Sequence, residues 1–510
     1  MTIHLPISLC IAHKNKPAFQ DNDGYGTYSI KHVFWNLMDA KLFLLACNLC
    51  LVSPLNGQRS EAEGGASPLH VKTECVSDAY RSVIHLELKN TMMRLRSEGI
   101  LPMSTDRGSI VQFDFPMRWS PGFDDYGFYG ISNFVDQDPN YPGFLLDYEC
   151  GARTYDTDAG YNHGGIDYFL WPFAWRLVDM DAVQAIAAAP GTIVGKTDGN
   201  QHFSCSFSSD NWNAVYVMHA DGSVAWYGHL KMNSLTSKDI GETVVAGEYL
   251  GIIASSGNST APHLHFEVHD AQNNLIDPNA GVCNSLNDET WWSDQLPYYN
   301  PRVNKIQTHF APPEFNTCPE LETTNASDEF APGEDVYFVV YLADQRNTDP
   351  LQLSITMPNG LPFDLWSFSQ PQSYLSASYW YWSNTLPMNA MEGTWTFRCV
   401  FAGEIYLHQF EVSNDISSAG DHTPEETYSF VMVNQNELAY FIKCNKGFYG
   451  TLRITDVSGR NVGKNESQFV AGENKIVMPV NDLSSGIYFL SLYDEKNTCL
   501  DVQKAMIHSK

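Results

Sequence analysis

Short hydrophobic runs separated by turn residues extend through most of the chain, a pattern typical of β-strands. The pattern is clearest over residues 166–270, where it predicts antiparallel strands joined by tight turns. Residues 215–219 and 224–227 flank the sequence Ala-Asp-Gly-Ser, and its Asp-Gly pair favours a hairpin turn. We therefore expect His229 to emerge just past the second strand of this hairpin, and we expect a mainly β fold.

A helical pattern occurs near the N-terminus. Over residues 76–98, hydrophobic residues recur at steps of three and four and stop before Gly99. This spacing predicts one amphipathic helix whose apolar side packs on a core. Core packing explains the pattern fully, so we assign no chemistry to the helix.

The second half of the chain predicts two further β domains. Residues 313–413 contain strand-like runs such as VYFVVY and GTWTFRCVF, which suggest an Ig-like β-sandwich. The aromatic run at residues 379–382 is expected to pack in the core and at the edge rather than to stack on sugars. Residues 414–426 are polar and acidic and predict a linker, after which residues 427–510 form another small β domain.

The apolar run at residues 42–52 follows Lys41 and precedes a turn, as in a signal peptide. It is shorter than the roughly 20 residues of a membrane-spanning helix. We expect translation to start at Met38 and cleavage to fall near Gly57-Gln58, leaving no transmembrane segment in the mature chain. A buried helix and a lipoprotein cleavage box ending at Cys47 are the alternatives.

The composition and net charge of the chain argue against some classes of function. The chain has 510 residues, enough for roughly three domains, with 30 Lys+Arg against 59 Asp+Glu and a net charge of −29. This charge argues against nucleic-acid binding, which needs positive side chains to engage phosphates. A monomer is expected.

Cysteine usage supports export. Eight of the 11 cysteines follow the leader, and an even number suits disulfides in an oxidising compartment. The expected domain layout suggests the pairs Cys318–Cys399 and Cys444–Cys499, whereas buried free thiols are the alternative.

Three groups of residues suggest metal chemistry. His163 and Asp167 flank a Gly-Gly pair that lets the backbone bend so that both side chains can meet one ion. His263 and His265 lie two residues apart in a strand-like run, so they share one face. His163, Asp167 and one member of the His263/His265 pair would supply three ligands and leave a fourth position open, as in catalytic zinc sites. The remaining histidine and His229 would move a proton and stabilise the developing oxyanion.

These residues resemble the lysostaphin/LytM-type zinc endopeptidases, which cut peptide bonds of bacterial peptidoglycan. The likeness covers roughly residues 155–280 and is most specific in SSGNSTAPHLHFEV. It implies an antiparallel β catalytic domain with one Zn²⁺ per chain, zinc ligands His163, Asp167 and His265, and catalytic histidines His229 and His263. Two departures, Ala261 and an insertion at residues 199–212, are not expected to touch a ligand.

The C-terminal region resembles a different family. DVSGR at residues 456–460 and LSSGIY at residues 483–488 are similar to the sorting domain recognised by the type IX secretion system of Bacteroidetes. The resemblance implies export through that machinery to the outer surface or the medium of a Gram-negative bacterium.

These inferences give one architecture and one function. The expected parts are residues 1–57 as upstream extension and signal peptide, 58–110 as a helical N-terminal region, 111–300 as the LytM-type zinc peptidase domain, 313–413 as the Ig-like sandwich, 414–426 as linker and 427–510 as the sorting domain. The predicted protein is a secreted zinc metalloendopeptidase that hydrolyses peptidoglycan stem peptides or cross-bridges through a metal-bound water. The alternative is a non-catalytic LytM-like protein that binds the cell wall or activates an amidase.

Overall fold

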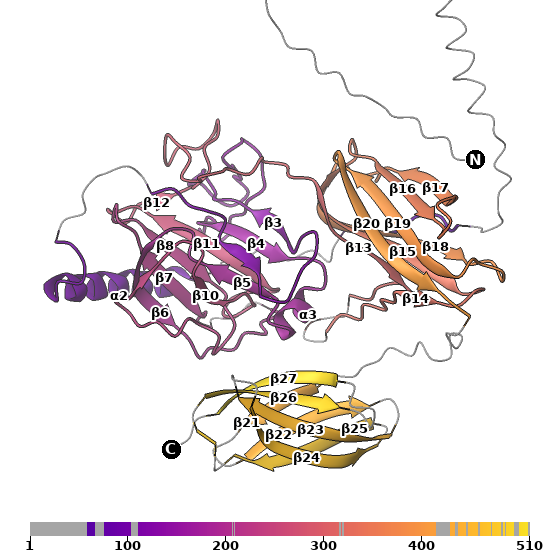
Figure 1. Ribbon diagram of the computed structural model, residues 1–510. Helices are drawn as coiled ribbons and strands as arrows, with labels where there is room; N and C mark the ends of the chain where they lie inside the picture. The colour runs from indigo at the N-terminus through magenta and orange to yellow at the C-terminus, as the bar shows by residue number, and fades with distance from the viewer. Residues whose placement is uncertain are drawn as a thin grey trace, which may run out of the picture. The chain divides into compact units, whose positions relative to one another are not determined.

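The computed structural model describes residues 59–66, 76–103, 111–414 and 429–507, apart from short gaps within the last two ranges. The predicted leader, the segment 415–428 and the side chains of Cys75, Cys444 and Cys499 lie outside the described residues, as do residues 457–459 of the DVSGR motif. The described part is mainly β, as predicted (Figure 1). Among the described residues, no helix has the length and apolar character needed to cross a membrane.

The predicted catalytic domain is built on an antiparallel sheet with the strand order β3-β4-β11-β8-β7-β6-β9, in which β12 also pairs with β11. A smaller sheet, β10-β5-β2, packs in the same domain. The elements of this domain after residue 111 are β2 (Met117–Trp119), β3 (Tyr129–Asn133), β4 (Ile166–Leu170), α3 (Ala174–Asp179), β5 (Val183–Ile186), β6 (Gly191–Thr197), β7 (Ala214–Met218), β8 (Val224–Gly228), β9 (Thr243–Val244), β10 (Tyr249–Ile252), β11 (His263–His269) and β12 (Leu275–Ile276).

The predicted hairpin and helix are both confirmed. Strands β7 and β8 pair around Gly222, whose φ of +90° suits the turn. Helix α2 (Asp78–Ser97) begins after Ser77, whose side chain accepts a hydrogen bond from the Tyr80 backbone N–H. Its residues Ile84, Leu88 and Leu95 are buried in one cluster with Trp226 and other side chains of the catalytic domain.

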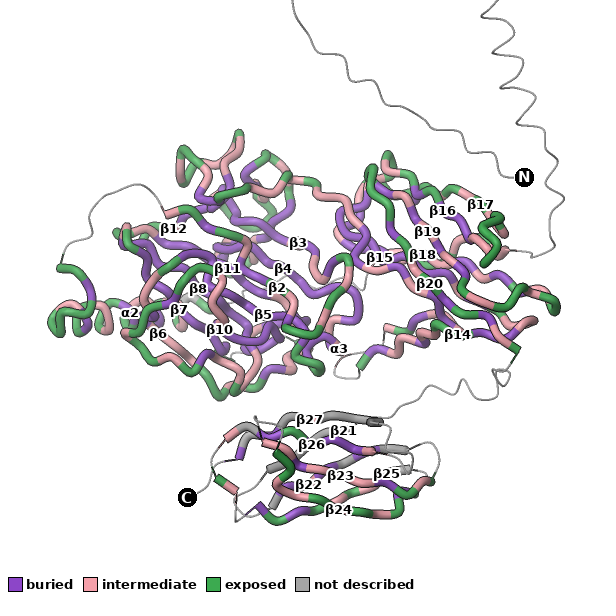
Figure 2. The backbone as a smooth tube through the Cα atoms, viewed as in Figure 1, coloured by how far each residue is buried: buried purple, intermediate pink, exposed green. Residues whose placement is uncertain are grey.

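Both faces of the central strands are covered. Every residue of β4, β7 and β8 is buried, and these strands are purple in Figure 2. One face, with Ile166, Leu264 and Phe266, belongs to the apolar core. The other face carries an apolar cluster with Tyr216 and Trp226 and, beside it, the buried polar side chains of Asp167, His265 and Glu267.

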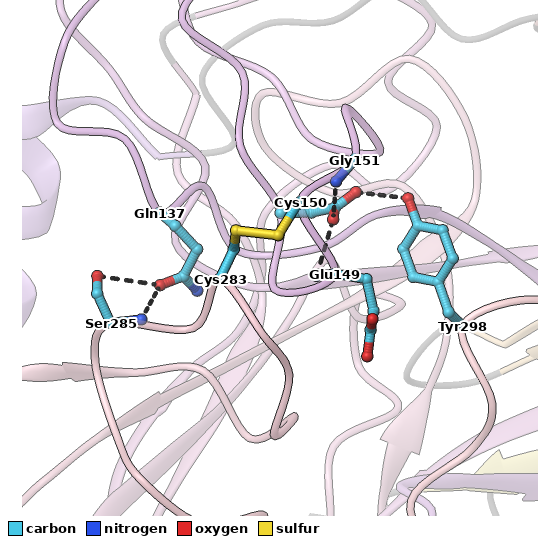
Figure 3. Close-up of a disulfide and its surroundings, with 8 residues drawn as sticks. Gln137, Glu149, Cys150, Gly151, Cys283, Ser285 and Tyr298 are labelled. Carbon is cyan, nitrogen blue, oxygen red and sulfur yellow. Dashed lines mark hydrogen bonds between the residues drawn. A yellow bond between two sulfur atoms is a disulfide. The ribbon is translucent and has the colours of Figure 1, made fainter.

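Away from the sheet, the Cys150–Cys283 disulfide joins two loops of the same domain (Figure 3). Near this disulfide, the Gln137 side-chain oxygen accepts hydrogen bonds from the backbone and side chain of Ser285. The hydroxyl of Tyr298 donates to Asp147. The two loops are thus joined covalently and supported by hydrogen bonds.

The sandwich consists of the sheets β1-β18-β15-β13 and β14-β20-β19-β16-β17. It starts earlier than the predicted residue 313, and its first strand comes from the region predicted to be helical. Its strands are β1 (Glu63–Ala66), β13 (Arg302–His309), β14 (Glu329–Phe330), β15 (Asp335–Arg346), β16 (Leu351–Thr356), β17 (Pro362–Phe368), β18 (Tyr374–Thr385), β19 (Gly393–Phe401) and β20 (Glu404–Val412). In β18, Trp380 and Trp382 are buried, so this aromatic run serves the core.

The predicted Cys318–Cys399 pair is wrong. Cys318 bonds to Cys205 of the catalytic domain's insertion, and Cys399 is a buried free thiol in the sandwich core. Cys399 points inward because it belongs to the buried set of the alternating strand β19. Burial raises the pKa of the Cys399 thiol to about 12.

The last domain is a second sandwich, made of the sheets β21-β22-β25 and β24-β23-β26-β27. Leu452, Ile454, Leu490 and Leu492 lie in its core. Its strands are β21 (Ser429–Val433), β22 (Glu437–Cys444), β23 (Phe448–Asp456), β24 (Asn461–Phe469), β25 (Gly472–Pro479), β26 (Gly486–Tyr493) and β27 (Cys499–Ile507).

Candidate metal centre

The pairing of β4 with β11 brings two of the predicted ligands together. Asp167 lies directly opposite His265 in this antiparallel register, although 98 residues separate them along the chain. The Asp167 Oδ1 and His265 Nδ1 atoms are 2.9 Å apart. Because side chains alternate along a strand, both point away from the apolar core.

His163 reaches the same point from the turn before β4. Its backbone N–H donates to the Tyr155 carbonyl, and its Nε2 lies 3.0 Å from Asp167 Oδ2. The turn depends on Gly165, because a Cβ there would lie 2.6 Å from two ring atoms of His265. The Gly-Gly pair is therefore needed for the close approach between this turn and β11.

The hydrogen bonds of His163 and His265 show how each ring could direct a lone pair at a cation. His163 Nδ1 lies 2.8 Å from the Phe134 carbonyl and must donate to it, so Nε2 of the neutral ring directs a lone pair at Asp167. His265 lies between two carboxylates, with Nε2 3.0 Å from Glu267 Oε2 and Nδ1 facing Asp167. If Nε2 donates to Glu267, the neutral ring has its lone pair on Nδ1, directed at Asp167; in a ring protonated on Nδ1, that nitrogen donates to Asp167 instead.

This donor set fits a divalent cation. Two imidazole nitrogens and one carboxylate oxygen lie within 4.8 Å of one another, and all three residues are buried. Two lone pairs and an anion facing each other are unfavourable unless a positive charge lies among them. Two His and one Asp form a typical three-ligand zinc set with an open fourth position.

Asp167 has the charge that a ligand requires. Burial by itself raises the pKa of Asp167, but the surrounding histidines, with His163 first, hold the pKa well below its ordinary value. Asn133 also donates its side-chain N–H to Asp167 Oδ2 at 3.0 Å. These interactions favour the carboxylate form of Asp167; the histidine contribution requires positive charge or N–H donation, and a bound cation would supply that positive charge when both rings are neutral.

The two predicted catalytic histidines lie beside this cluster. The rings of His229 and His263 are 4.2 Å apart between centroids, and His263 Nε2 is 3.7 Å from Asp167 Oδ1. His229 follows β8, as predicted, with a left-handed φ of +61°, a strained conformation that occurs at functional sites. Its Nδ1 lies 2.6 Å from the Ser256 carbonyl. Of the five predicted site residues, His263 has the most exposed side chain, at 13%.

The insertion at residues 199–212 contacts the site, contrary to the prediction. The Trp212 ring packs against His265 and His229, with centroids 5.6 and 5.1 Å away. Trp212 fits there because Gly228 has no side chain: a Cβ on Gly228 would lie 2.4 Å from the indole ring. Ala261 also contacts the site, since its backbone carbonyl oxygen lies 2.9 Å from Nδ1 of His263, a predicted catalytic histidine.

Sequence analysis missed Glu267, although a signal was present. Strand β11 reads His-Leu-His-Phe-Glu-Val-His, and its two-residue period places Glu267 and His269 on the face of the predicted ligands. Two further histidines of this domain, His219 and His202, do not belong to the cluster. His219 bonds to the Pro190 carbonyl, and burial lowers the pKa of His202 to about 4.

Two family models match segments of the chain. Residues 178–278 match Peptidase family M23, and residues 434–508 match the secretion system C-terminal sorting domain. The first match contains His229, His263 and His265 and begins after His163 and Asp167, which the fold adds to the site.

Two curated relatives match parts of the chain. Cell division protein DipM of Caulobacter vibrioides is 30% identical over 125 residues, which is 22% of this chain and 20% of DipM. DD-carboxypeptidase/endopeptidase Mpg of Neisseria meningitidis is 42% identical over 55 residues, or 11% of this chain and 12% of Mpg. The chain thus spans a fifth or less of either relative.

Among solved structures, a Pseudomonas aeruginosa protein described as a peptidase M23 is 17% identical with a TM-score of 0.20, covering 38% of this chain and 60% of that one. The two family models match a central segment and a C-terminal segment of the chain. The chain therefore contains a peptidase domain of family M23 and ends in a secretion system C-terminal sorting domain.

Proposed function

We propose that the protein is an exported zinc metalloendopeptidase that hydrolyses a peptide bond in the stem or cross-bridge of bacterial peptidoglycan. The observation that carries the proposal is the convergence of His163 Nε2, His265 Nδ1 and the Asp167 carboxylate, whose donor atoms lie within 4.8 Å of one another in a buried site. The family match and the name of the relative Mpg, an endopeptidase, support hydrolysis of a peptide bond.

His163, Asp167 and His265 would hold the zinc ion, one per chain. When bound, zinc supplies a Lewis acid that polarises a carbonyl and lowers the pKa of water. Phe134 and Glu267 hold the two imidazoles with their lone pairs toward the shared point. Their contribution is orientation of the ligands, which outer partners of metal sites commonly provide.

His229 and His263 would carry the proton chemistry. Each ring places Nδ1 against a backbone carbonyl, that of Ser256 or Ala261, so the neutral rings present Nε2 as an acceptor. One ring would take a proton from the attacking water and pass it to the leaving amine. The other would stabilise the negative charge that develops on the scissile carbonyl oxygen.

The sorting domain supports delivery outside the cell. Its match covers residues 434–508, and we propose the type IX secretion machinery as its partner. The acidic net charge of −29 suits a soluble exported protein. The proposed place of action is the cell surface or the medium.

The test uses the purified mature protein and isolated sacculi of several cross-link types. The proposal predicts one zinc per chain and release of new amines from at least one sacculus type. Chelation should abolish that release, and added zinc should restore it. A protein that binds sacculi without zinc and without releasing amines would be a cell-wall binding module, and the enzymatic proposal would be wrong.

A further inference from the structure

A buried carboxylate lies behind the candidate metal centre. The Glu267 side chain is fully buried and has three partners. His265 Nε2 lies 3.0 Å from Glu267 Oε2, and His269 Nε2 lies 2.6 Å from Oε1. The third partner is Arg81, which bonds to both carboxylate oxygens.

Arg81 comes from helix α2, 186 residues away along the chain and before the matched M23 residues. Its side chain is only 18% exposed, and its guanidinium lies 5.4 Å from the centre of the Trp226 ring. It also approaches the turn that carries His163, because a Cβ on Gly164 would lie 3.7 Å from Arg81 Nη2. One side chain of the helix is therefore held between the two segments that supply the ligands.

An unpaired carboxylate in this position would be costly. Removing one partner of a buried ion pair leaves a buried charge without compensation, whereas a bidentate Arg fixes the carboxylate in one plane. Glu267 lies within hydrogen-bond distance of His265 Nε2, so its position helps to fix the orientation of the His265 ring. The contacts thus form a chain from Arg81 through Glu267 to the ring that faces Asp167.

We propose that Arg81 is a positioning residue for the metal centre: it fixes Glu267, which holds the His265 ring with Nδ1 toward Asp167 and the proposed ion. This inference rests on the proposed function, since it assigns a role toward the proposed zinc ion. Helix α2 then belongs to the working enzyme. Loss of helix α2 would therefore weaken zinc binding at the metal centre and would not activate the enzyme.

The primary test measures zinc affinity of the full mature chain by competition with a chromophoric chelator. Arg81→Met keeps most of the side-chain volume and removes the charge, and we expect zinc binding to weaken about 10- to 100-fold. Arg81→Lys keeps a charge and should recover part of the loss. Replacing zinc with Co²⁺ gives a second readout, since the visible absorption of Co²⁺ reports ligand geometry and should change in Arg81→Met.

A matched control lies on the same helix. Arg94 forms an exposed ion pair with Glu98 at 3.0 Å, so Arg94→Met removes an arginine without touching the centre. Its zinc affinity should stay within about twofold of the wild type, because surface pairs contribute little.

A double variant separates positioning from folding. Glu267→Gln removes the buried charge that Arg81 neutralises, so the two substitutions should not add. In the Glu267→Gln background, Arg81→Met should weaken zinc binding by less than about threefold further. The double variant also leaves no uncompensated buried carboxylate, so it provides a folded protein even if Arg81→Met alone unfolds.

The outcomes distinguish the two proposals. If the wild type binds no zinc, the proposed function fails. If the wild type binds zinc and folded Arg81→Met binds it equally well with an unchanged Co²⁺ spectrum, the positioning role alone is wrong. Full additivity of the two substitutions, or a rise in peptidase activity in Arg81→Met, would also overturn it.

Discussion

Strand β11 of the peptidase domain and strand β18 of the sandwich both alternate with a period of two, yet they use the alternation differently. In β18, the buried set includes Trp380 and Trp382, while the intervening tyrosines are partly exposed. In β11, the apolar set and the set containing His265 and Glu267 are both buried. Buried polar groups are costly unless they are paired. The polar set of β11 is buried because its members are paired with one another and with neighbouring groups, among them Asp167 and Arg81.

The largest effect is expected for Asp167→Ala, which removes the anion between the two imidazoles of the proposed metal centre. We expect zinc affinity to fall more than about 100-fold, beyond the range of outer-partner substitutions. Peptidase activity should disappear with the metal. Metal analysis after dialysis checks the prediction, and a variant that retains one zinc per chain would contradict it.

His229→Ala should separate binding from chemistry. Its side chain lies beside the ligands and is proposed to handle a proton, so the rate should fall about 10²- to 10⁴-fold. Zinc content should remain one per chain. Amine release from sacculi measures the rate, and unchanged turnover would exclude His229 from the chemistry.

Trp382→Ala tests the buried apolar set of strand β18 in the sandwich. Trp382 is 2% exposed and packs against Trp366 and Phe368, so its loss should destabilise the sandwich by about 3–5 kcal/mol. Urea unfolding of this domain measures the change in free energy of unfolding. Zinc affinity should not change, and a parallel loss of zinc would contradict a purely structural role for the sandwich core.

Asp277 gives a smaller effect that depends on pH. Burial raises the pKa of Asp277 to about 7, so the folded protein holds a proton that the unfolded chain releases at lower pH. Stability should therefore fall as pH rises from about 4 to about 7, by on the order of 1–4 kcal/mol. Unfolding measured across this range should lose this slope in Asp277→Asn, whatever that variant's absolute stability. An identical slope in both proteins would contradict the assignment.

Local periodicity predicted much of the peptidase sheet and of helix α2. The shared face of His263 and His265 followed from the strand period, and the turn at Gly222 followed from its Asp-Gly pair. The resemblance to LytM-type enzymes added the choice of ligands. The structure then brings His163 and Asp167 to His265 through the β4–β11 register.

Contacts distant in sequence were not predictable in this way. Strand β1 pairs with β18, yet its sequence Glu-Gly-Gly-Ala carries no strand pattern. The Cys205–Cys318 bond joins the insertion to a segment beyond the peptidase sheet, while Cys399 is buried by its position in β19. Arg81 meets Glu267 only because α2 packs against the sheet through the apolar cluster that contains Trp226. Each of these contacts depends on docking between elements rather than on local propensity.

The most direct test of the account is the zinc stoichiometry of the purified wild-type chain, measured beside Asp167→Ala. The account predicts one zinc per wild-type chain and none in the variant, because the two imidazoles need the carboxylate between them. A wild-type chain that holds no zinc after incubation with the metal, or a variant that holds as much as the wild type, would contradict it.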